Sequence, residues 1–228
     1  MQNTSRYQIQ SVDNALRLIR MLQAGEVLQV STVAQHLGVG RSTAHRLLSM
    51  LIQHGFAVQG PDREYLRGPS LHDPQAALPV GLSLAELRRR ALPILHTLTE
   101  RTQETTNLQL ILGDYSRVVA SVESDRPLRV SNREGQYLPA SMSSGGRAVR
   151  GKGTSVLDAC EFAINDQDIE EGITAIGMAV KSAVISGALA VSIAMPSVRF
   201  DRESLAQWVN AMAQASQSLS ESLDQTVA

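Results

Sequence analysis

The chain has 228 residues, of which 43% are hydrophobic, and a formal net charge of −1. This length allows one large domain or two smaller ones with buried cores, and the near-neutral charge excludes a uniformly basic coat for nucleic acid. A single cysteine excludes an internal disulfide, and no apolar run reaches the roughly 20 residues of a membrane span. Because the start of the chain lacks the pattern of a secretory signal, we expect a cytoplasmic protein with no membrane segment.

The charge is distributed unevenly along the chain. Residues 1–70 contain seven arginines against four acidic residues, whereas residues 71–228 contain fourteen basic residues against eighteen acidic ones. This difference predicts different electrostatic roles for the two parts. The difference in charge supports a functional role only where a sequence motif indicates the same role.

Apolar residues recur at helical spacing in three segments of the first part. The pattern predicts one helix over residues 11–24, a second from Ser31, and a third from about Arg41 to Gln53. Gly38 lies between the second and third helices, where a sharp turn needs a residue that tolerates positive φ. The third helix has one apolar face for a core and one polar face.

A β-hairpin is predicted directly after the third helix. Two short apolar runs within residues 56–67 flank Gly60, Pro61 and Asp62, which are typical of a turn longer than two residues. Three helices and a hairpin complete a small domain. Proline and glycine in residues 72–81 indicate a linker after it.

A long helix is expected to follow the linker. Ser83 and Glu86 have the spacing of a capping box at its start, and Pro93 is expected to kink or restart it. Its leucines suit either the core of the same chain or a second copy, and the pattern does not distinguish these two roles.

From residue 107 onward the apolar period becomes that of strands. The predicted strands cover residues 107–112, 117–123, 127–131, 173–180 and 187–195, with a turn near 182–187 between the last two. The final segment, residues 201–223, has the period of an amphipathic helix. The second part is therefore predicted to be an α+β domain with helices flanking an antiparallel sheet.

The turn at Gly38 gives the first part the pattern of a helix-turn-helix. In that motif the second helix enters the major groove of DNA, so its exposed face must carry polar donors. The third helix and the hairpin supply eight candidate DNA contacts: Arg41, Ser42, Thr43, His45, Arg46, Arg63, Tyr65 and Arg67. We expect His45 and Arg46 to contact base edges, and the helix start and the hairpin to contact phosphates or the minor groove.

This polar face allows two other interpretations. An ordinary helical bundle also has a solvated outer helix. A metal site is disfavoured, because His36, His45 and His54 lie nine residues apart with no cysteine beside them, so no i, i+4 pair of imidazoles is present. We expect neither a metal nor a cofactor.

Four segments together resemble the isocitrate-lyase-regulator (IclR) family of bacterial transcription factors: SVDNALRLI, VAQHLGVGRSTAHRLLSMLIQHGFAVQ, YLRGPSL and LPILHTLTERTQETTNLQLILG. The resemblance implies a winged helix-turn-helix domain over residues 9–70, a linker and linker helix over 71–103, and a GAF-like effector-binding domain over 104–228. It also implies homodimers, and homotetramers built from them, on an inverted-repeat operator of double-stranded DNA. The first helix and the linker helix are the candidate dimer surfaces. We therefore expect a ligand-responsive DNA-binding regulator, a repressor by default, and not an enzyme.

The resemblance also implies a pocket for a small organic acid. The candidate effector-binding residues are Leu128, Val130, Leu138, Ser144, Gly145, Asp166, Ile173, Ala175, Ser192 and Ala194, with Asn165 as the alternative to Asp166. Ser141, Ala175 and Ala194 replace residues that are more polar in the family, so we expect a ligand with a larger apolar body, such as an aromatic carboxylate. Residues 149–164 are shorter than the corresponding helical segment of the family, so a lid over the pocket is expected to be missing. Ordinary turn and core roles are the alternatives for these positions.

A nucleotide-binding enzyme is the alternative function. Residues 146–154, GRAVRGKGT, fit the spacing of a phosphate-binding loop, which needs a buried strand directly before Gly146 and a glycine-rich arc. Here LPASMSSG comes first, and the residues of the arc suit a helix. Helical structure over residues 146–150 would exclude this alternative.

Overall fold

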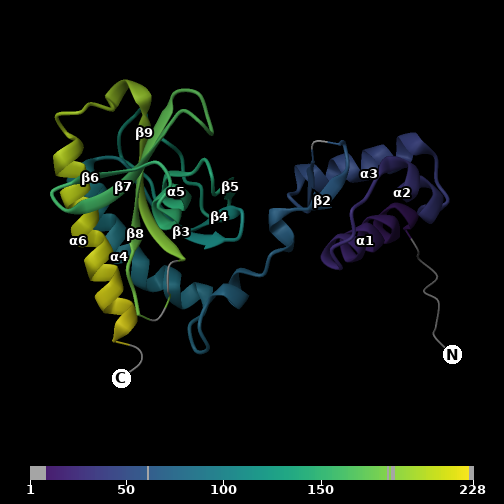
Figure 1. Cartoon of the computed structure of the whole chain (residues 1–228), viewed down its shortest axis with the longest axis horizontal. Coiled ribbons are helices and arrows are strands. Elements are labelled where there is room, and N and C mark those ends of the chain that lie inside the picture. Colours follow the sequence, from purple (N-terminus) through teal and green to yellow (C-terminus); the bar gives the residue numbers. More distant parts are fainter. Residues whose placement is uncertain (1–8, 61, 184, 186–187, 226–228) are drawn as a thin grey trace. The chain divides into compact units, whose positions relative to one another are not determined.

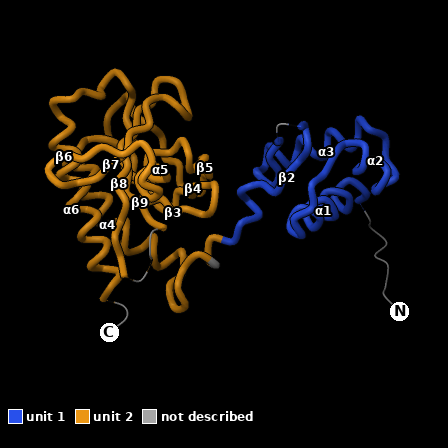
Figure 2. The backbone as a smooth tube through the Cα atoms, in the orientation of Figure 1, with its two compact units in different colours: residues 1–73 blue, residues 74–228 orange. Residues whose placement is uncertain are grey.

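The computed structural model describes residues 9–60, 62–183, 185 and 188–225. The chain divides into two compact units, Met1–Asp73 and Pro74–Ala228 (Figure 2). The boundary between them lies within the linker that was predicted over residues 72–81. Each unit has its own hydrophobic core, so the two are described separately.

The first unit contains three α-helices, a short hairpin and one 3-10 turn (Figure 1). Its elements are α1 (Gln10–Gln23), α2 (Val30–Leu37), α3 (Arg41–Gln53), β1 (Ala57–Gln59), β2 (Tyr65–Arg67) and η1 (Pro69–Leu71). The predicted bounds of the third helix are confirmed at both ends. The second helix starts earlier than predicted, because Gln29 is its N-cap and Ser31 is already helical.

The turn between α2 and α3 depends on Gly38. This residue has φ 64° and ψ 34°, a left-handed conformation that glycine adopts without a steric penalty. The N–H of Val39 donates to the carbonyl of Ala34 across the turn, at 3.0 Å. With the helices joined in this way, Leu18 of α1 and Leu48 of α3 are fully buried in the core of this unit. The helix-turn-helix of the sequence analysis is therefore present.

The second unit is an α+β domain built on one sheet. Its elements are η2 (Pro74–Ala77), α4 (Leu84–Thr102), β3 (Thr105–Leu112), β4 (Tyr115–Val122), β5 (Tyr137–Pro139), α5 (Ser144–Arg150), β6 (Thr154–Leu157), β7 (Cys160–Asp166), β8 (Ile173–Val180), β9 (Leu189–Pro196), η3 (Ser197–Arg199) and α6 (Leu205–Asp224). The seven strands are antiparallel, in the order β5-β4-β3-β9-β8-β7-β6. The predicted fold class is confirmed.

Helices cover both faces of this sheet. The helices α4 and α6 lie side by side against one face, and the short α5 lies against the other (Figure 1). Strand β3 shows the difference between the faces: Leu108 and Leu110 are fully buried in the core beneath α4 and α6, whereas Asn107 and Gln109 point to the side of α5. One face is therefore an apolar core, and the other carries polar side chains.

Strand β4 contains one residue more than its partner β3. The pairing passes from Leu108 with Ala120 to Gln109 with Val118, which leaves Val119 unpaired in a β-bulge. Val119 packs in the core with Ala120, so two successive residues face the helices. The bulge therefore reverses which residues of the first half of β4 face α5.

The helix α5 approaches the sheet more closely than side chains would allow. A Cβ atom at Gly177, on β8, would lie 2.3 Å from the carbonyl carbon of Ser144. At Gly146, on α5 itself, a Cβ would lie 2.2 Å from the carbonyl oxygen of Ala140. These two glycines are needed for the contact between backbones and not for an unusual φ.

Several predictions for the second unit were wrong. Residues 127–131 form a loop and not a strand, because Pro127 has no N–H for a sheet and the side chain of Arg129 bonds to Glu123 and to loop carbonyls. Pro93 does not restart the helix, because α4 continues through it without a break. The short segment after α5 is occupied by the hairpin of β6 and β7, which was not predicted. The turn predicted near 182–187 falls partly outside the described residues.

Candidate DNA-binding surface and ligand pocket

Five of the candidate DNA contacts share the exposed face of α3. Arg41, Ser42, Thr43, His45 and Arg46 are all exposed, whereas Ala44 and Leu48 turn into the core. The N-cap is Gly40, which has no side chain to bond to the helix start. The N–H groups of the first turn are therefore available to an anionic ligand such as a phosphate.

The hairpin supplies two of its three candidate contacts. Arg63 and Arg67 are exposed, and Arg67 also donates to the carbonyl of Leu71. Tyr65 is a correction: it is only 2% exposed and belongs to the core, because its backbone pairs with Leu28 through two hydrogen bonds of 2.7 and 2.9 Å. A buried tyrosine at this position cannot contact DNA.

A ligand pocket lies on the α5 side of the sheet in the second unit. Six of the ten candidate effector residues line it: Leu138, Ser144, Ile173, Ala175, Ser192 and Ala194. They come from β5, α5, β8 and β9, so the pocket collects residues that are distant in the sequence. The open space between the lining side chains is about 40 Å³, which corresponds to about three water molecules.

The other four candidates do not line the pocket. The side chain of Leu128 is 60% exposed and its carbonyl accepts a hydrogen bond from Arg199 at 2.8 Å, while Val130 is buried away from the pocket. Asp166 is exposed and accepts a hydrogen bond from Thr174 at 3.0 Å. Gly145 is buried behind Gln109, where a Cβ would come within 2.5 Å of the amide oxygen of that side chain. It therefore supports the pocket without lining it.

Seven lining residues were not predicted from the sequence, namely Asn107, Gln109, Val118, Arg133, Ser143, Ile169 and Glu170. A signal existed for Asn107 and Gln109, because polar and apolar residues alternate in NLQL and two buried amides on one strand face need polar partners. Asn165, the alternative to Asp166, does line the pocket. Arg133 and Glu170 lie in loops, where no period indicates the direction of a side chain.

A hydrogen-bonded network forms the floor of the pocket. Gln109 donates to the hydroxyl of Ser192 at 2.8 Å and accepts from the hydroxyl of Ser116 at 2.5 Å. Ser116 reaches Gln109 because the bulge in β4 turns it to this face. These three polar side chains, each 4% exposed or less, therefore satisfy one another.

Two further buried polar atoms at the pocket have no partner in the described structure. They are the side-chain oxygen of Asn107, which is 4% exposed, and the hydroxyl of Ser144, which is 1% exposed. Buried polar groups are nearly always hydrogen-bonded, and an unpaired one costs about 1–3 kcal/mol. Both residues line the pocket, so a polar ligand there would supply the missing partners.

Two ion pairs join the loops around the pocket. Arg133 pairs with Glu170, and both residues line the pocket. Outside it, Arg147 of α5 pairs with Asp168 at 2.7 Å. The N–H of Asp168 also donates to the side-chain oxygen of Asn165 at 3.0 Å. The loop from β7 to β8 is therefore fixed to α5 and to β7.

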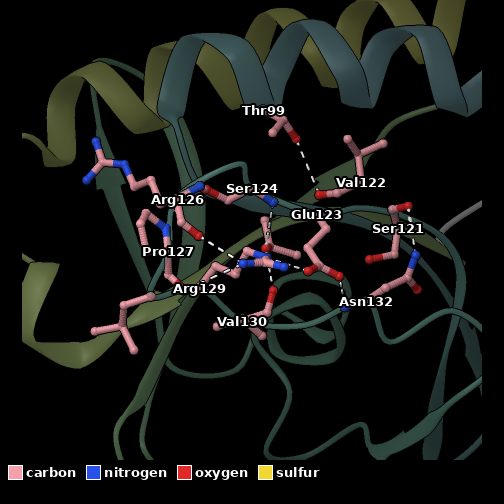
Figure 3. Close-up of polar contacts among 12 residues, drawn as sticks. Thr99, Ser121, Val122, Glu123, Ser124, Arg126, Pro127, Arg129, Val130 and Asn132 are labelled. Atoms are coloured by element: carbon pink, nitrogen blue, oxygen red, sulfur yellow. Dashed lines mark hydrogen bonds and ion pairs between the residues drawn. The ribbon is translucent and has the colours of Figure 1, made fainter.

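The start of β3 contacts α4 on one side of the sheet and the loop after β4 on the other. Figure 3 shows Thr99 of α4 directed toward the carbonyl of Val122, at the end of β4. Thr106 donates to the carbonyl of Leu95 at 3.0 Å and shares a 2.7 Å hydrogen bond with Thr99 of α4. On the other side, Thr105 donates to the carbonyl of Val130 at 2.6 Å. Two adjacent threonines thus connect the helix with the loop over residues 123–132.

Beside that loop, the carboxylate of Glu123 points toward Arg129 and Asn132 (Figure 3). It accepts hydrogen bonds from the guanidinium of Arg129 and, at 2.9 Å, from the N–H of Asn132. The Arg129 contact, with a smaller contribution from the Asn132 N–H, lowers the pKa of Glu123 below its ordinary value. The charged carboxylate therefore helps to fix the loop.

Across the described residues no group of three His, Cys, Asp or Glu side chains could hold a metal ion. None of the helices in that part of the chain is long and apolar enough to cross a bilayer. The alternative phosphate-binding loop is contradicted, because Ser144–Arg150 is helical where the arc of that loop would be.

Two family models match the chain. The model for the IclR helix-turn-helix domain matches residues 11–61, and the model for the bacterial transcriptional regulator IclR C-terminal domain matches residues 81–151. Together they span more than half of the chain. Each match falls within one of the two compact units.

Curated proteins are similar to part of the chain. The HTH-type transcriptional regulator XynR of Escherichia coli (strain K12) is 29% identical over 144 residues, which are 62% of this chain and 56% of XynR. The transcriptional repressor IclR of the same strain is 29% identical over 148 residues, which are 62% of this chain and 52% of that protein. The match therefore spans about half the length of each relative. The matching relatives are named as regulators or repressors, and none as an enzyme.

Solved structures share the fold. One is an IclR homolog complexed with 4-hydroxybenzoate from Microbacterium hydrocarbonoxydans, with a TM-score of 0.53, 20% identity, and coverage of 94% of this chain and 99% of that one. At this identity the match shows the fold alone. Because the two family models match in the order of the two units, the chain belongs to the IclR family of bacterial transcriptional regulators.

Proposed function

We propose that this chain is a ligand-responsive repressor that binds an operator through α3 and a small organic acid in the pocket of the second unit. The exposed face of α3 supports this proposal more than any other observation, because its arginines, hydroxyls and histidine surround a helix start suited to a phosphate. Such a protein acts in the cytoplasm, where its operator is accessible.

In this proposal the residues of α3 have two roles. Arg46 and His45 contact base edges in the major groove, while Arg41, Ser42 and Thr43 contact phosphates. The hairpin contributes Arg63 and Arg67 to the DNA backbone or the minor groove, and Tyr65 is no longer included. All seven side chains that remain are exposed, as this role requires.

A dimer on an inverted repeat is part of the same proposal. On α1, Ile9, Val12 and Leu16 are 66%, 51% and 54% exposed, at a spacing that puts them along one side of the helix. An exposed apolar stripe of this kind is typical of a surface that a partner covers. A second copy of the chain would bury it and place two α3 helices about 34–36 Å apart on the operator. Tetramers would pair such dimers.

The pocket supports an organic acid as the effector. Its lining combines the guanidinium of Arg133 with the unpartnered oxygens of Asn107 and Ser144 and with apolar side chains such as Leu138 and Ile173. The family member whose structure contains 4-hydroxybenzoate has the same fold. An aromatic carboxylate with a second polar group fits this chemistry. If it prefers one spacing of the paired DNA-binding units, it changes operator affinity by the same coupling free energy.

Operator binding is tested with two arginine variants. Arg46→Ala should reduce the discrimination between the chain's own upstream DNA and random duplex by about 1–3 kcal/mol. Arg63→Ala should weaken binding to both DNAs to a similar extent, and the slope of log K against log salt concentration should become smaller by about 1. Arg202→Ala, an exposed arginine of the second unit, is the control for loss of charge. Equal binding of both DNAs by the unchanged protein, with and without aromatic acids, would contradict the proposal.

A further inference from the structure

Glu170 and Arg133 form an ion pair inside the lining of the pocket. The side chain of Arg133 is 15% exposed and that of Glu170 is 56% exposed, so the guanidinium is the more buried partner. Arg133 is the one cation among the lining residues of the described structure, and Glu170 is the one anion. The pocket therefore contains a carboxylate that already occupies its only basic group.

The loop that carries Glu170 is held by other contacts. Asp168 bonds to Arg147 and Asn165, the N–H of Gly172 donates to the side chain of Gln167 at 2.9 Å, and the N–H of Gln167 donates to the carbonyl of Ile173 at 3.0 Å. None of these contacts uses the side chain of Glu170. Its carboxylate can therefore leave Arg133 without unfolding the loop.

We propose that Glu170 is a built-in substitute for the effector carboxylate, and that an acidic ligand binds by displacing Glu170 from Arg133. This inference rests on the proposed effector function of the pocket. Displacement exchanges one charge-assisted hydrogen bond for another, and the half-exposed Glu170 carboxylate regains water. Displacement of Glu170 also opens the pocket, whose free space is about 40 Å³, at the position that this side chain leaves.

The same arrangement defines the class of ligand. A monocarboxylate replaces Glu170 charge for charge, so the pocket stays neutral when the ligand is bound. The unpartnered oxygens of Asn107 and Ser144, which also line the pocket, favour a hydroxyl group on the ligand. A neutral molecule of the same shape leaves Arg133 with Glu170. The ion pair therefore makes the pocket select hydroxylated monocarboxylic acids over their neutral analogues.

The experiment compares Glu170→Gln with Glu171→Gln in the full chain. Glu171 is the exposed neighbour of Glu170 and does not line the pocket, so it is a matched control for loss of one negative charge. Calorimetry measures the Kd of 4-hydroxybenzoate and of its neutral analogue 4-hydroxybenzamide. We expect Glu170→Gln to bind the acid about three- to fivefold more tightly than the unchanged protein, because the competing surface ion pair is removed. The amide and the Glu171→Gln variant should show no gain.

The outcomes separate this inference from the proposed function. If the unchanged protein binds the acid and Glu170→Gln binds it no more tightly, Glu170 is not a substitute and the inference is wrong. An equal gain for acid and amide would also overturn it, since this would indicate a wider opening without competition for charge. If neither protein binds the acid, the effector function fails and the inference fails with it. Arg133→Gln should weaken binding of the acid and leave the Kd of the amide unchanged.

Discussion

The two units carry their candidate sites in opposite ways. The DNA-binding surface of the first unit consists of exposed residues from one helix and a hairpin, while its core lies beneath them. In the second unit the pocket combines polar and apolar residues from six strands, the helix α5 and the loops between them. A helix surface is a local property of sequence, whereas a pocket exists only when distant segments have come together. The first site therefore tolerates changes elsewhere in its unit better than the second.

The largest expected effect is a loss of stability in the first unit without a change in the second. Leu48→Ala removes a side chain that is fully buried beneath the exposed face of α3, so we expect the free energy of unfolding of the first unit to fall by about 2–5 kcal/mol. Trp208, the only tryptophan, is buried in the second unit, so its fluorescence reports the unfolding of that unit. Circular dichroism should show an earlier transition while the fluorescence transition stays in place. A joint shift would show that the two units unfold together.

A smaller effect is expected at the contact between α5 and the sheet. Gly177→Ala places a methyl group against the backbone of Ser144, and we expect a loss of about 1–3 kcal/mol in the stability of the second unit. Because Ser144 lines the pocket, binding of 4-hydroxybenzoate should weaken as well. Tryptophan fluorescence in urea measures the first effect. Ser155→Ala, on the exposed side of β6, is the control and should change neither.

The smallest expected effect depends on pH and concerns Glu123. Since Arg129 and the N–H of Asn132 lower its pKa, the charged form stabilises the fold above the ordinary glutamate pKa of about 4.3, and this contribution is lost as the pH falls through the lower value in the folded protein. The difference in urea stability between the unchanged protein and Glu123→Gln should therefore be present near neutral pH and disappear in acid. A difference independent of pH would show that the charge has no role.

The sequence predicted the parts of the fold that depend on local periodicity. The third helix and the strand over residues 173–180 were predicted with the bounds observed. Both have a regular apolar period and a turn residue at one end. The exposure of Arg41 and Arg46 follows from the same period, so the candidate DNA-binding face was largely predictable.

Features that depend on tertiary pairing could not be predicted in the same way. Tyr65 is buried because it pairs with Leu28, which is distant in the sequence and lies in no regular strand. Residues 127–131 have the composition of a strand, but the side chain of Arg129 donates a hydrogen bond to Glu123 and holds the segment as a loop. Arg133 and Glu170 meet only when two loops close over the sheet. No local pattern indicates such encounters.

The bulge in β4 determines whether a neutral or a charged side chain of this strand faces the pocket side of the sheet. It places Ser116 on the pocket side, while the next residue, Arg117, pairs with Leu110 on the opposite side. If β4 were straightened by a slip of one residue, Arg117 would replace Ser116, and a cation would replace a neutral hydroxyl. A shift of strand register within this fold can therefore alter the charge preference of a sensor without substitution of either residue.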